Sequence, residues 1–598
     1  MEKQKTRDEI ENQYKWDLSK MYHSKQDLDK DISMIEDVSE EIKQMQGHIM
    51  DSSDSLYQYL KKSEILDRKL EQVYVYAHML CDEDGTNSES QSLKIKTETL
   101  NDKLNEKLSF IRPEILSCSY DKVKEYIEEK EELKEYTFMF ESLFRFKCHT
   151  LTKEEEQIVA MASNAFGTPD NVFYNLDNVD VHFGKIHNEE NKEVELTHSN
   201  YIYYLSSKNR KVRKEAFDTL YKYYEQFKNT FASSLQGQIK ENYFYSKVRK
   251  YKNPLEASLF SDNIDESVYH TLIETVHKNL DPMYDYMKLR KEILNLDEMH
   301  MYDIFTPLIS SKIEDIPYEE AKTIIKEALT PLGKDYINDL QKAFDENWID
   351  IYPNKGKKSG AYSWGTYDSN PYVCLNYDNT IDSVSTMAHE LGHSMHSYYS
   401  NKNQNYVDHA YPIFLAEIAS TVNEVLLNQY LYDHAKTKEE KILYLTELLD
   451  KVRTTIYRQT MFAEFEMIMH EKEEKGIPLT EKEFSDTYYK LNQLYYGDNI
   501  ISDDAIRYEW ARIPHFYTSF YVYKYATGLS SAITLAFNIL ENKENALEKY
   551  LQFLSSGGKN YPLAILKEAG VDMTSPKPIE KALDIFKQKL EELKNLYQ

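Results

Sequence analysis

Residues that break helices are rare along this chain. Only 16 glycines and 15 prolines occur in 598 residues, and both residue types destabilise the interior of a helix. From about residue 22 to 145, apolar residues recur every three or four positions among charged ones, as in Leu66, Leu70, Val73 and Ala77. This period places the apolar residues on one helix face. We therefore expect a mainly α fold of long amphipathic helices.

A few short segments lack the helical period. Residues 179–184 alternate as a strand or hairpin does. Residues 356–365 are polar and contain glycine, which predicts a loop and a short strand. Residues 371–377 carry β-branched and aromatic side chains, which predict one strand. A small β-sheet is therefore expected within the helical fold.

The length of the chain predicts more than one lobe. A chain of 598 residues exceeds what one hydrophobic core usually supports. The non-helical character of the segment before residue 185 and the return of helical patterns from Ser207 favour a boundary near 185–205. We predict an N-terminal helical lobe, residues 1–200, and a second domain, residues 201–598.

Charge and hydropathy exclude several classes of partner. The net charge of −28 disfavours a nucleic-acid partner, because phosphate backbones are bound by clusters of Lys and Arg. The longest apolar stretch, near residues 528–540, is too short and too polar to span a bilayer. The N-terminus is charged, and no signal peptide is visible. Four scattered cysteines, with no C-x-x-C pair, indicate free thiols in a reducing compartment. We expect a soluble cytoplasmic protein.

One segment carries the residue pattern of a metal centre. Residues 382–400 predict a helix that contains His389-Glu390-Leu391-Gly392-His393, with Asp382 or Thr380 as its N-cap. At about 100° per residue, His393 lies roughly 40° from His389, and His396 lies roughly 20° to the other side. Apolar residues gather near the opposite face. The helix is therefore expected to bury one face and to present imidazoles on the other.

This spacing suits zinc chemistry. Two neutral imidazoles one turn apart can both approach one Zn²⁺. Glu390, about 100° from His389 on the helical wheel, does not ligate the same ion easily but can reach a water on it. A carboxylate in that place can take a proton from the water and pass it to the leaving amine, while the ion polarises the scissile carbonyl. The pattern predicts one catalytic Zn²⁺ per chain, with Glu390 as general base.

A third protein ligand is needed, and two candidates are visible. His396 is near in sequence, but it lies almost a turn further along the same helix, so the neighbouring residues of that helix would crowd the ion. Glu417 is the lone charge in a mostly apolar helical run, which is costly unless it is paired with a Lys or Arg or bound to a cation. Glu424 lies seven residues on, where it either orients a ligating imidazole or is a plain surface carboxylate.

These segments resemble oligoendopeptidase F, of the thimet oligopeptidase and neurolysin group of metallopeptidases. The resemblance is carried by residues 389–399 and 414–420, by Trp16-Asp17-Leu18 and by Gly360-Ala361-Tyr362-Ser363. It implies His389, His393 and Glu417 as the zinc ligands, with His396 and Glu424 as neighbouring residues. The fold implied is almost wholly helical, with two lobes around a deep substrate channel, a zincin-type active site and an edge strand for the substrate.

Relatives of this kind also carry a histidine followed by tyrosines in the C-terminal third. His515, Tyr521 and Tyr525 match that spacing, and the resemblance implies that they donate to the oxyanion and to substrate carbonyls. The four-residue separation predicts both tyrosines on one helix face, where a buried aromatic stripe is the competing interpretation. Thimet-type relatives have glycines between this histidine and the first tyrosine, whereas this chain does not. Tyr517 and Tyr523 therefore stay open as alternatives.

Together these features predict a zinc-dependent metalloendopeptidase of the HExxH class that cleaves internal bonds of short unfolded oligopeptides. Residues 201–598 are expected to form its catalytic metallopeptidase domain. One alternative is a helical peptide-binding or scaffold protein with a structural metal site, although structural zinc sites are closed and four-liganded. The other is a metallo-exopeptidase resembling dipeptidyl carboxypeptidases, which needs a group that captures a peptide terminus. The sequence contains no lone Arg or Glu whose surroundings indicate that role.

Overall fold

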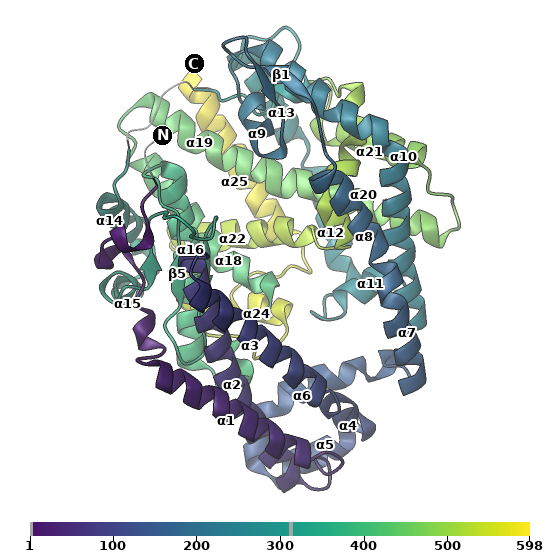
Figure 1. Ribbon diagram of the computed structural model, residues 1–598. Coiled ribbons are helices and arrows are strands. Elements are labelled where there is room, and N and C mark those ends of the chain that lie inside the picture. The colour runs from purple at the N-terminus through teal and green to yellow at the C-terminus, as the bar shows by residue number, and fades with distance from the viewer. Residues whose placement is uncertain (1–3, 310–314, 598) are drawn as a thin grey trace. The chain divides into compact units, whose positions relative to one another are not determined.

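The structure, a computed structural model, describes residues 4–309 and 315–597 and is 71% helix and 3% strand. Figure 1 shows the mainly helical ribbon. The described residues form two compact units, each assembled from three segments. Unit 1 contains residues 4–148, 315–430 and 535–570, and unit 2 contains residues 149–309, 431–534 and 571–597. The predicted mainly α fold is confirmed.

Unit 1 begins with the long amphipathic helices that the sequence predicted. Their N-termini are capped by side chains, as where Ser52 accepts a hydrogen bond from the backbone of Ser55. The helices that lie in this unit, wholly or for most of their length, are α1 (Lys25–Gln44), α2 (Ser53–Glu83), α3 (Ser88–Lys107), α4 (Ile111–Ser117), α5 (Tyr120–Glu129), α6 (Thr137–Arg145), α14 (Tyr318–Ala328), α15 (Lys334–Asp345), α16 (Ile381–Asn403), α17 (Tyr406–His409), α18 (Ile413–Asp433), α23 (Ala546–Leu554) and α24 (Pro562–Glu568).

A three-stranded sheet lies in unit 1, with the strand order β3-β5-β4. The central strand β5 (Tyr372–Cys374) runs parallel to β3 (Ile349–Asp350) and antiparallel to β4 (Tyr362–Trp364). The structure confirms the strand predicted within 371–377 and the loop with a short strand predicted within 356–365. Because β5 is central, β4 forms one edge of the sheet.

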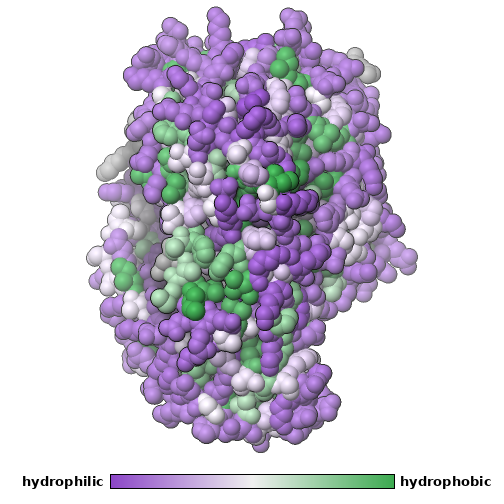
Figure 2. Space-filling view, turned by 90° about the vertical axis from the view of Figure 1, so that its right-hand side faces the viewer, coloured by the Kyte–Doolittle hydropathy of each residue, from purple (hydrophilic) through white to green (hydrophobic). Residues whose placement is uncertain are grey.

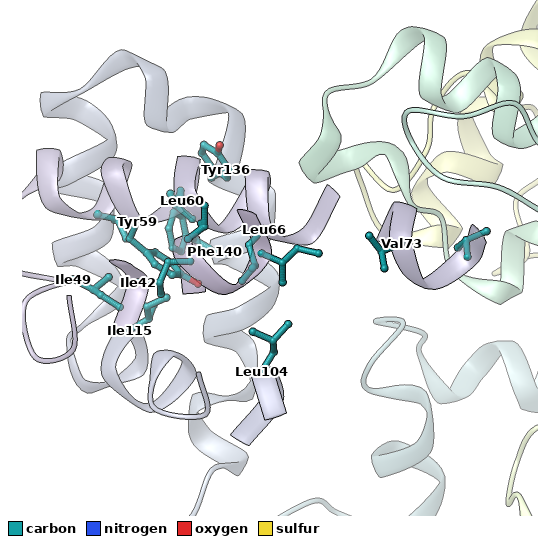
Figure 3. Packing of buried hydrophobic residues seen from close by; sticks show 14 of the residues in the cluster. Ile42, Ile49, Tyr59, Leu60, Leu66, Val73, Leu104, Ile115, Tyr136 and Phe140 are labelled. Carbon is teal, nitrogen blue, oxygen red and sulfur yellow. The ribbon is translucent and has the colours of Figure 1, made fainter. Parts of the chain in front are cut away.

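The N-terminal helices share one hydrophobic core. Figure 3 shows Ile42 of α1, Leu60 of α2 and Phe140 of α6 meeting between their helices, and all three are at most 5% exposed. The same cluster of buried residues includes Tyr372 and Cys374 of β5. The core of the N-terminal helices therefore continues into the sheet, although more than 200 residues of sequence separate the two.

Polar contacts bind the start of the chain to the same sheet. Arg7 and Lys357 both form buried ion pairs with Asp350 of β3. The backbone N–H of Ile351 donates to the carbonyl of Tyr14 at 3.1 Å. These contacts explain why the compact units differ from the predicted segments 1–200 and 201–598. The domain boundary near residue 200 stays a prediction.

Unit 2 is built around α10 (Arg210–Val248), a helix of 39 residues. Its other helices are α7 (Lys153–Phe166), α8 (Thr168–Tyr174), α9 (His198–Leu205), α11 (Pro254–Leu259), α12 (Glu266–Lys278), α13 (Asp281–Ile293), α19 (Lys438–Val452), α20 (Arg458–Glu474), α21 (Glu481–Tyr496) and α25 (Lys577–Tyr597). Helix α22 (Tyr523–Leu540) begins in unit 2 and ends in unit 1.

The strand or hairpin predicted at residues 179–184 was placed wrongly. Residues Asn175–Val179 form a π-helical turn, and the hairpin pairs β1 (Lys185–His187) with β2 (Glu193–Glu195). The alternating pattern did not indicate a strand, because Val179 is 60% exposed and belongs to the π-helical turn. The nearby π-helical turn is instead held by Asp177, whose carboxylate accepts a hydrogen bond from the Tyr224 hydroxyl at 2.7 Å.

The surface shown in Figure 2 is mostly hydrophilic, with smaller apolar areas between polar ones. This agrees with a chain in which 29% of residues are charged. Among the residues that the structure describes, no helix combines the length and the apolarity that a membrane span requires.

Candidate metal centre and a second cluster around His515

Helix α16 carries the predicted metal-binding motif. Thr380 caps its N-terminus, where its hydroxyl accepts the N–H of Ser383 at 3.2 Å. One face is fully buried through Val384, Met387, Ala388, Leu391 and Met395, as predicted. His389 and His393 lie elsewhere on the helix, with side chains 26% and 18% exposed. Their Nε2 atoms are 3.2 Å apart.

A glycine lets a second helix approach this motif closely. A Cβ atom at Gly392 would lie 2.5 Å from Cα of Ser420 and 2.9 Å from the carbonyl oxygen of Ala419, both on α18. No side chain fits in that space without separating the backbones. The side-chain amide of Asn423 adds a buried hydrogen bond of 3.0 Å to the carbonyl of Ala388. The two helices are therefore held at a fixed, short separation.

This packing places Glu417 of α18 against both histidines. Its Oε2 atom lies 3.5 Å from Nε2 of His389 and 3.7 Å from Nε2 of His393. Within residues 4–309 and 315–597, these three side chains are the one group whose ligand atoms converge as a metal site requires. Two imidazole nitrogens and a carboxylate oxygen are the donor set of a catalytic zinc site. Glu417 is therefore directed at the cluster.

The surroundings of the histidines fit a cation. Nδ1 of His389 lies 2.6 Å from Oε1 of Glu424. Since an ionised carboxylate only accepts hydrogen bonds, Nδ1 carries the proton and Nε2 keeps its lone pair for the cluster. His393 is oriented by a hydrogen bond to the backbone of Ala416. Both imidazoles are thus fixed by α18 in the state that a metal ligand needs.

The pKa values of the two histidines shift in opposite directions. Burial and the neighbouring His389 lower the pKa of the His393 imidazole to about 3, so His393 is neutral near pH 7. Burial alone would lower the pKa of His389, but the hydrogen bond to Glu424 and the nearby carboxylates outweigh it and raise that pKa. A bound cation would oppose this increase, because it repels the added proton.

Glu390 lies beside the ligand group and outside it. The residue is 7% exposed, and its carboxylate is hydrogen-bonded to the backbone of Ser363 on the edge strand β4. Burial raises the pKa of Glu390 to about 7. A pKa near neutral suits a group that both accepts and returns a proton. The hydroxyls of Ser363 and Ser394, 2.8 Å apart, also join β4 to α16.

His396 does not lie with the other two histidines, which corrects the shared imidazole face predicted for this helix. Its ring is fully buried and stacks on Tyr411, with centroids 3.6 Å apart. Burial lowers its pKa to about 3. Neither ring nitrogen has a hydrogen-bond partner in the described structure. The helical wheel failed here because the 20° offset and the extra turn direct this ring into the apolar core.

The second predicted cluster forms in unit 2. Nε2 of His515, on the 3-10 helix η11 (Pro514–Tyr517), lies 3.1 Å from the hydroxyl of Tyr525. The ring of Tyr521 is 5.4 Å from that of Tyr525 and 6.4 Å from that of His515. The structure therefore brings together the three residues that the sequence selected.

The predicted helical geometry of the tyrosines is wrong. Tyr521 precedes α22, which begins at Tyr523, so the two tyrosines do not share a helix face. A turn brings them together, in which the N–H of Tyr525 donates to the carbonyl of Val522. Tyr517 stacks on Phe173 instead, at 4.5 Å, and Tyr523 is fully buried.

Sequence reasoning missed three residues that support the metal centre. Gly392 sets the helix separation, Asn423 fixes it, and Ser363 holds the carboxylate of Glu390. A glycine inside a helical motif is a signal that close packing is required. The other two residues act across long sequence separations and leave no such signal.

The helical fold and the His-His-Glu group define a class of protein, and comparison with known families identifies it. Residues 203–585 match Peptidase family M3, and residues 114–183 match Oligopeptidase F. The first match covers more than half of the chain. The chain therefore belongs to peptidase family M3.

Individual relatives extend this similarity over nearly the whole chain. The chain is 42% identical to Oligopeptidase PepF of Bacillus subtilis over 99% of its own length and 88% of the relative. It is 40% identical to Group B oligopeptidase PepB of Streptococcus agalactiae, covering 99% and 98% of the two chains. The crystal structure of oligoendopeptidase-F from Enterococcus faecium superposes with a TM-score of 0.73 at 36% identity, covering 96% and 99%. These findings confirm the resemblance to oligoendopeptidase F and support a metallo-oligopeptidase.

Proposed function

We propose that the chain is a zinc-dependent endopeptidase that hydrolyses internal bonds of short oligopeptides, with Glu390 as general base. The observation that carries the proposal is the convergence of His389, His393 and Glu417 beside a buried carboxyl group. The names of the relatives, oligopeptidase and oligoendopeptidase, support the substrate class. Short unfolded peptides as partners and a cytoplasmic location stay predictions.

His389, His393 and Glu417 would hold the cation. When bound there, a zinc ion supplies Lewis acidity to a water molecule and to the scissile carbonyl. The hydrogen bond from His389 to Glu424 keeps the ligating nitrogen unprotonated and correctly oriented. The three protein ligands leave room for further coordination, as catalytic sites require.

Glu390 would move the proton. Its carboxylate accepts a proton from the attacking water and delivers it to the nitrogen of the leaving amine. The hydrogen bond from the Ser363 backbone holds the carboxylate in one orientation throughout both transfers. The water-poor setting that raises the pKa of Glu390 to about 7 makes both transfers nearly balanced in energy.

The cluster around His515 would stabilise the negative charge that develops on the carbonyl oxygen. The hydroxyl of Tyr525, paired with His515, and that of Tyr521 are the donors that the proposal assigns to this role. Burial and the charge of Arg458 lower the pKa of His515, so its imidazole is neutral near pH 7. A neutral imidazole that donates its Nε2–H to the Tyr525 oxygen holds this tyrosine in place and leaves the hydroxyl proton free to donate to the oxyanion.

A set of peptides with blocked termini tests the proposal. N-acetylated and C-amidated peptides of about 8–15 residues should be cut at internal bonds, and chelator should abolish the cuts. Glu390→Gln should lower kcat by about 10²- to 10⁴-fold while zinc content, measured by elemental analysis, stays at one per chain.

Each rival hypothesis gives a different result. An exopeptidase would cut only peptides with a free terminus. A scaffold protein would bind peptides without cutting them. Cuts that persist after complete removal of metal, or full turnover by the Glu390→Gln variant, would contradict the mechanism.

A further inference from the structure

The segment between η11 and α22 has an unusual backbone. Phe520, the residue directly before Tyr521, has φ of +58°. This left-handed conformation is disfavoured for residues with a bulky side chain. The ring of Phe520 is 2% exposed and packs 4.5 Å from the ring of His470. The conformation therefore persists only because the surrounding residues impose it.

A buried glutamate holds the backbone at this position. Glu466 on α20 is 3% exposed, and its Oε1 atom accepts the N–H of Phe520 at 2.6 Å. Its Oε2 atom has no hydrogen-bond partner in the described part of the chain. Burial raises the pKa of Glu466 well above its ordinary value. A carboxyl group is costly to bury for the sake of a single hydrogen bond.

A chain of hydrogen bonds holds the neighbouring residue. Nδ1 of His470 donates to the carbonyl of Glu466 at 2.8 Å. Its Nε2 atom accepts from the side-chain amide of Asn242 on α10 at 3.1 Å, and the same amide donates to the hydroxyl of Ser519. Burial lowers the pKa of His470 to about 4, which keeps this donor and acceptor pattern intact near neutral pH.

A third helix completes the set of contacts. The hydroxyl of Ser258 on α11 donates to the carbonyl of Ser519 at 3.2 Å. The Ser519 hydroxyl, the Ser519 carbonyl and the Phe520 amide are thus each bound by a different helix. The turn sets the position of Tyr521 and the start of α22, and therefore the direction of the Tyr525 side chain.

We propose that Glu466 is a positioning residue that fixes the left-handed turn at Phe520 and thereby aligns Tyr521 and Tyr525 with His515. This inference rests on the proposed function, in which the tyrosine hydroxyls donate to the substrate. No glycine lies between His515 and Tyr521, and contacts from Glu466, Asn242 and Ser258 hold this segment in one conformation.

Replacing Glu466 tests its proposed role as a positioning residue. Glu466→Leu removes the acceptor and leaves the Phe520 amide unpaired. We expect kcat on a blocked peptide to fall by about 10- to 100-fold, with KM changed less than about 3-fold, because misplaced oxyanion donors act on the transition state. Glu466→Gln keeps a side-chain oxygen acceptor for the Phe520 amide in a group of the same shape and should retain kcat within about 3-fold. Zinc content should not change in either variant.

A matched control lies on the same helix. Glu464 accepts hydrogen bonds of 2.8 Å from His277 and from Tyr495, away from the 518–520 turn. Glu464→Leu should lower the melting temperature but leave kcat near that of the unaltered protein. An equal loss of kcat in the Glu464 and Glu466 variants would overturn the proposal, because it would reflect general damage to α20.

Two further variants keep the proposal testable if Glu466→Leu fails to fold. Asn242→Ala removes the donor to Ser519 and should lower kcat by about 3- to 10-fold, the effect expected for one lost hydrogen bond. Tyr525→Phe separates the two levels of the argument. Full kcat in Tyr525→Phe would contradict the proposed role of this tyrosine. Low kcat in Tyr525→Phe beside full kcat in Asn242→Ala and Glu466→Leu would overturn only the positioning role of Glu466.

Discussion

The metal centre and the His515 cluster are built in different ways. In the candidate metal centre, two regular helices carry every proposed ligand, and one glycine brings their backbones together. In the His515 cluster, a 3-10 helix, an irregular turn and the first turn of α22 carry the three side chains. The first site is fixed by helical spacing, and the second by buried polar contacts from distant parts of the sequence. A site fixed by helical spacing can therefore be predicted from a single sequence, whereas a site fixed by contacts between distant parts of the chain cannot.

Loss of the metal should have the largest effect. Glu417→Ala removes one of three ligands, so we expect zinc to dissociate and peptidase activity to disappear. His396→Ala is the control, because the buried ring lies outside the ligand group. That variant should keep its zinc and lose stability by about 2–4 kcal/mol through the cavity it leaves. Elemental analysis and thermal unfolding distinguish the two, and zinc loss from the His396 variant alone would reverse the assignment.

The irregular site should respond next most strongly. Tyr525→Phe removes one hydroxyl donor and should lower kcat by about 10²- to 10³-fold, as for other oxyanion donors, without changing zinc content. Tyr517→Phe is the comparison, because that ring stacks on Phe173 instead, and its kcat should change little. A larger loss in the Tyr517 variant would move the donor role to that residue.

The helix separation in the regular site gives a third, smaller effect. Gly392→Ala places a methyl group 2.5 Å from backbone atoms of α18, so we expect the free energy of unfolding to fall by about 1–3 kcal/mol and zinc affinity to weaken. Gly528→Ala on α22 is a matched control, since a Cβ there meets no atom within 4 Å. It should be neutral or stabilising by about 0.5–1 kcal/mol. Equal effects of both variants would contradict the close-packing argument.

Acid should produce the smallest effect, and in unit 2. Glu509 is buried, which alone would raise its pKa, but Arg458 and Arg512 outweigh burial and lower it. Its pKa is thus lower folded than unfolded. The stability it contributes is present above the unfolded pKa of about 4.3 and is lost as pH falls through the folded pKa.

The melting temperature of metal-depleted protein should therefore drop below about pH 4.3, by about 2–4 °C per kcal/mol lost. Metal is removed first because acid also protonates its ligands. Glu509→Gln should melt lower at pH 7 and lose less on acidification. An identical acid dependence in both proteins would show that other carboxyl groups dominate.

Much of the metal centre could be predicted from sequence because its determinants are local. The spacing of His389 and His393, the cap at Thr380 and the isolation of Glu417 in an apolar helix all lie within 40 residues. The orientation of His396 could not be predicted, because a helical wheel shows the direction of a side chain around the helix axis but not its position along that axis relative to the core.

The turn at Phe520 escaped prediction for a different reason. Its conformation depends on Glu466, 54 residues away, and on Asn242, more than 270 residues away. A left-handed phenylalanine also runs against local preference, so the sequence alone favours an ordinary helical continuation. The same limit explains the strand predicted too early at residues 179–184.

The way the chain passes between its two units has a consequence during synthesis. Residues 4–148 of unit 1 leave the ribosome about 390 residues before the segment 535–570 that completes the unit. At about 5–20 residues per second, the N-terminal helices wait roughly 20–80 s for their last packing partners. The surface that residues 535–570 later cover, which includes the ring of Phe138 against Tyr561, stays exposed to other chains during that interval. The completed fold therefore forms late in translation, and a chain truncated before residue 535 lacks part of unit 1 even though every metal ligand is present.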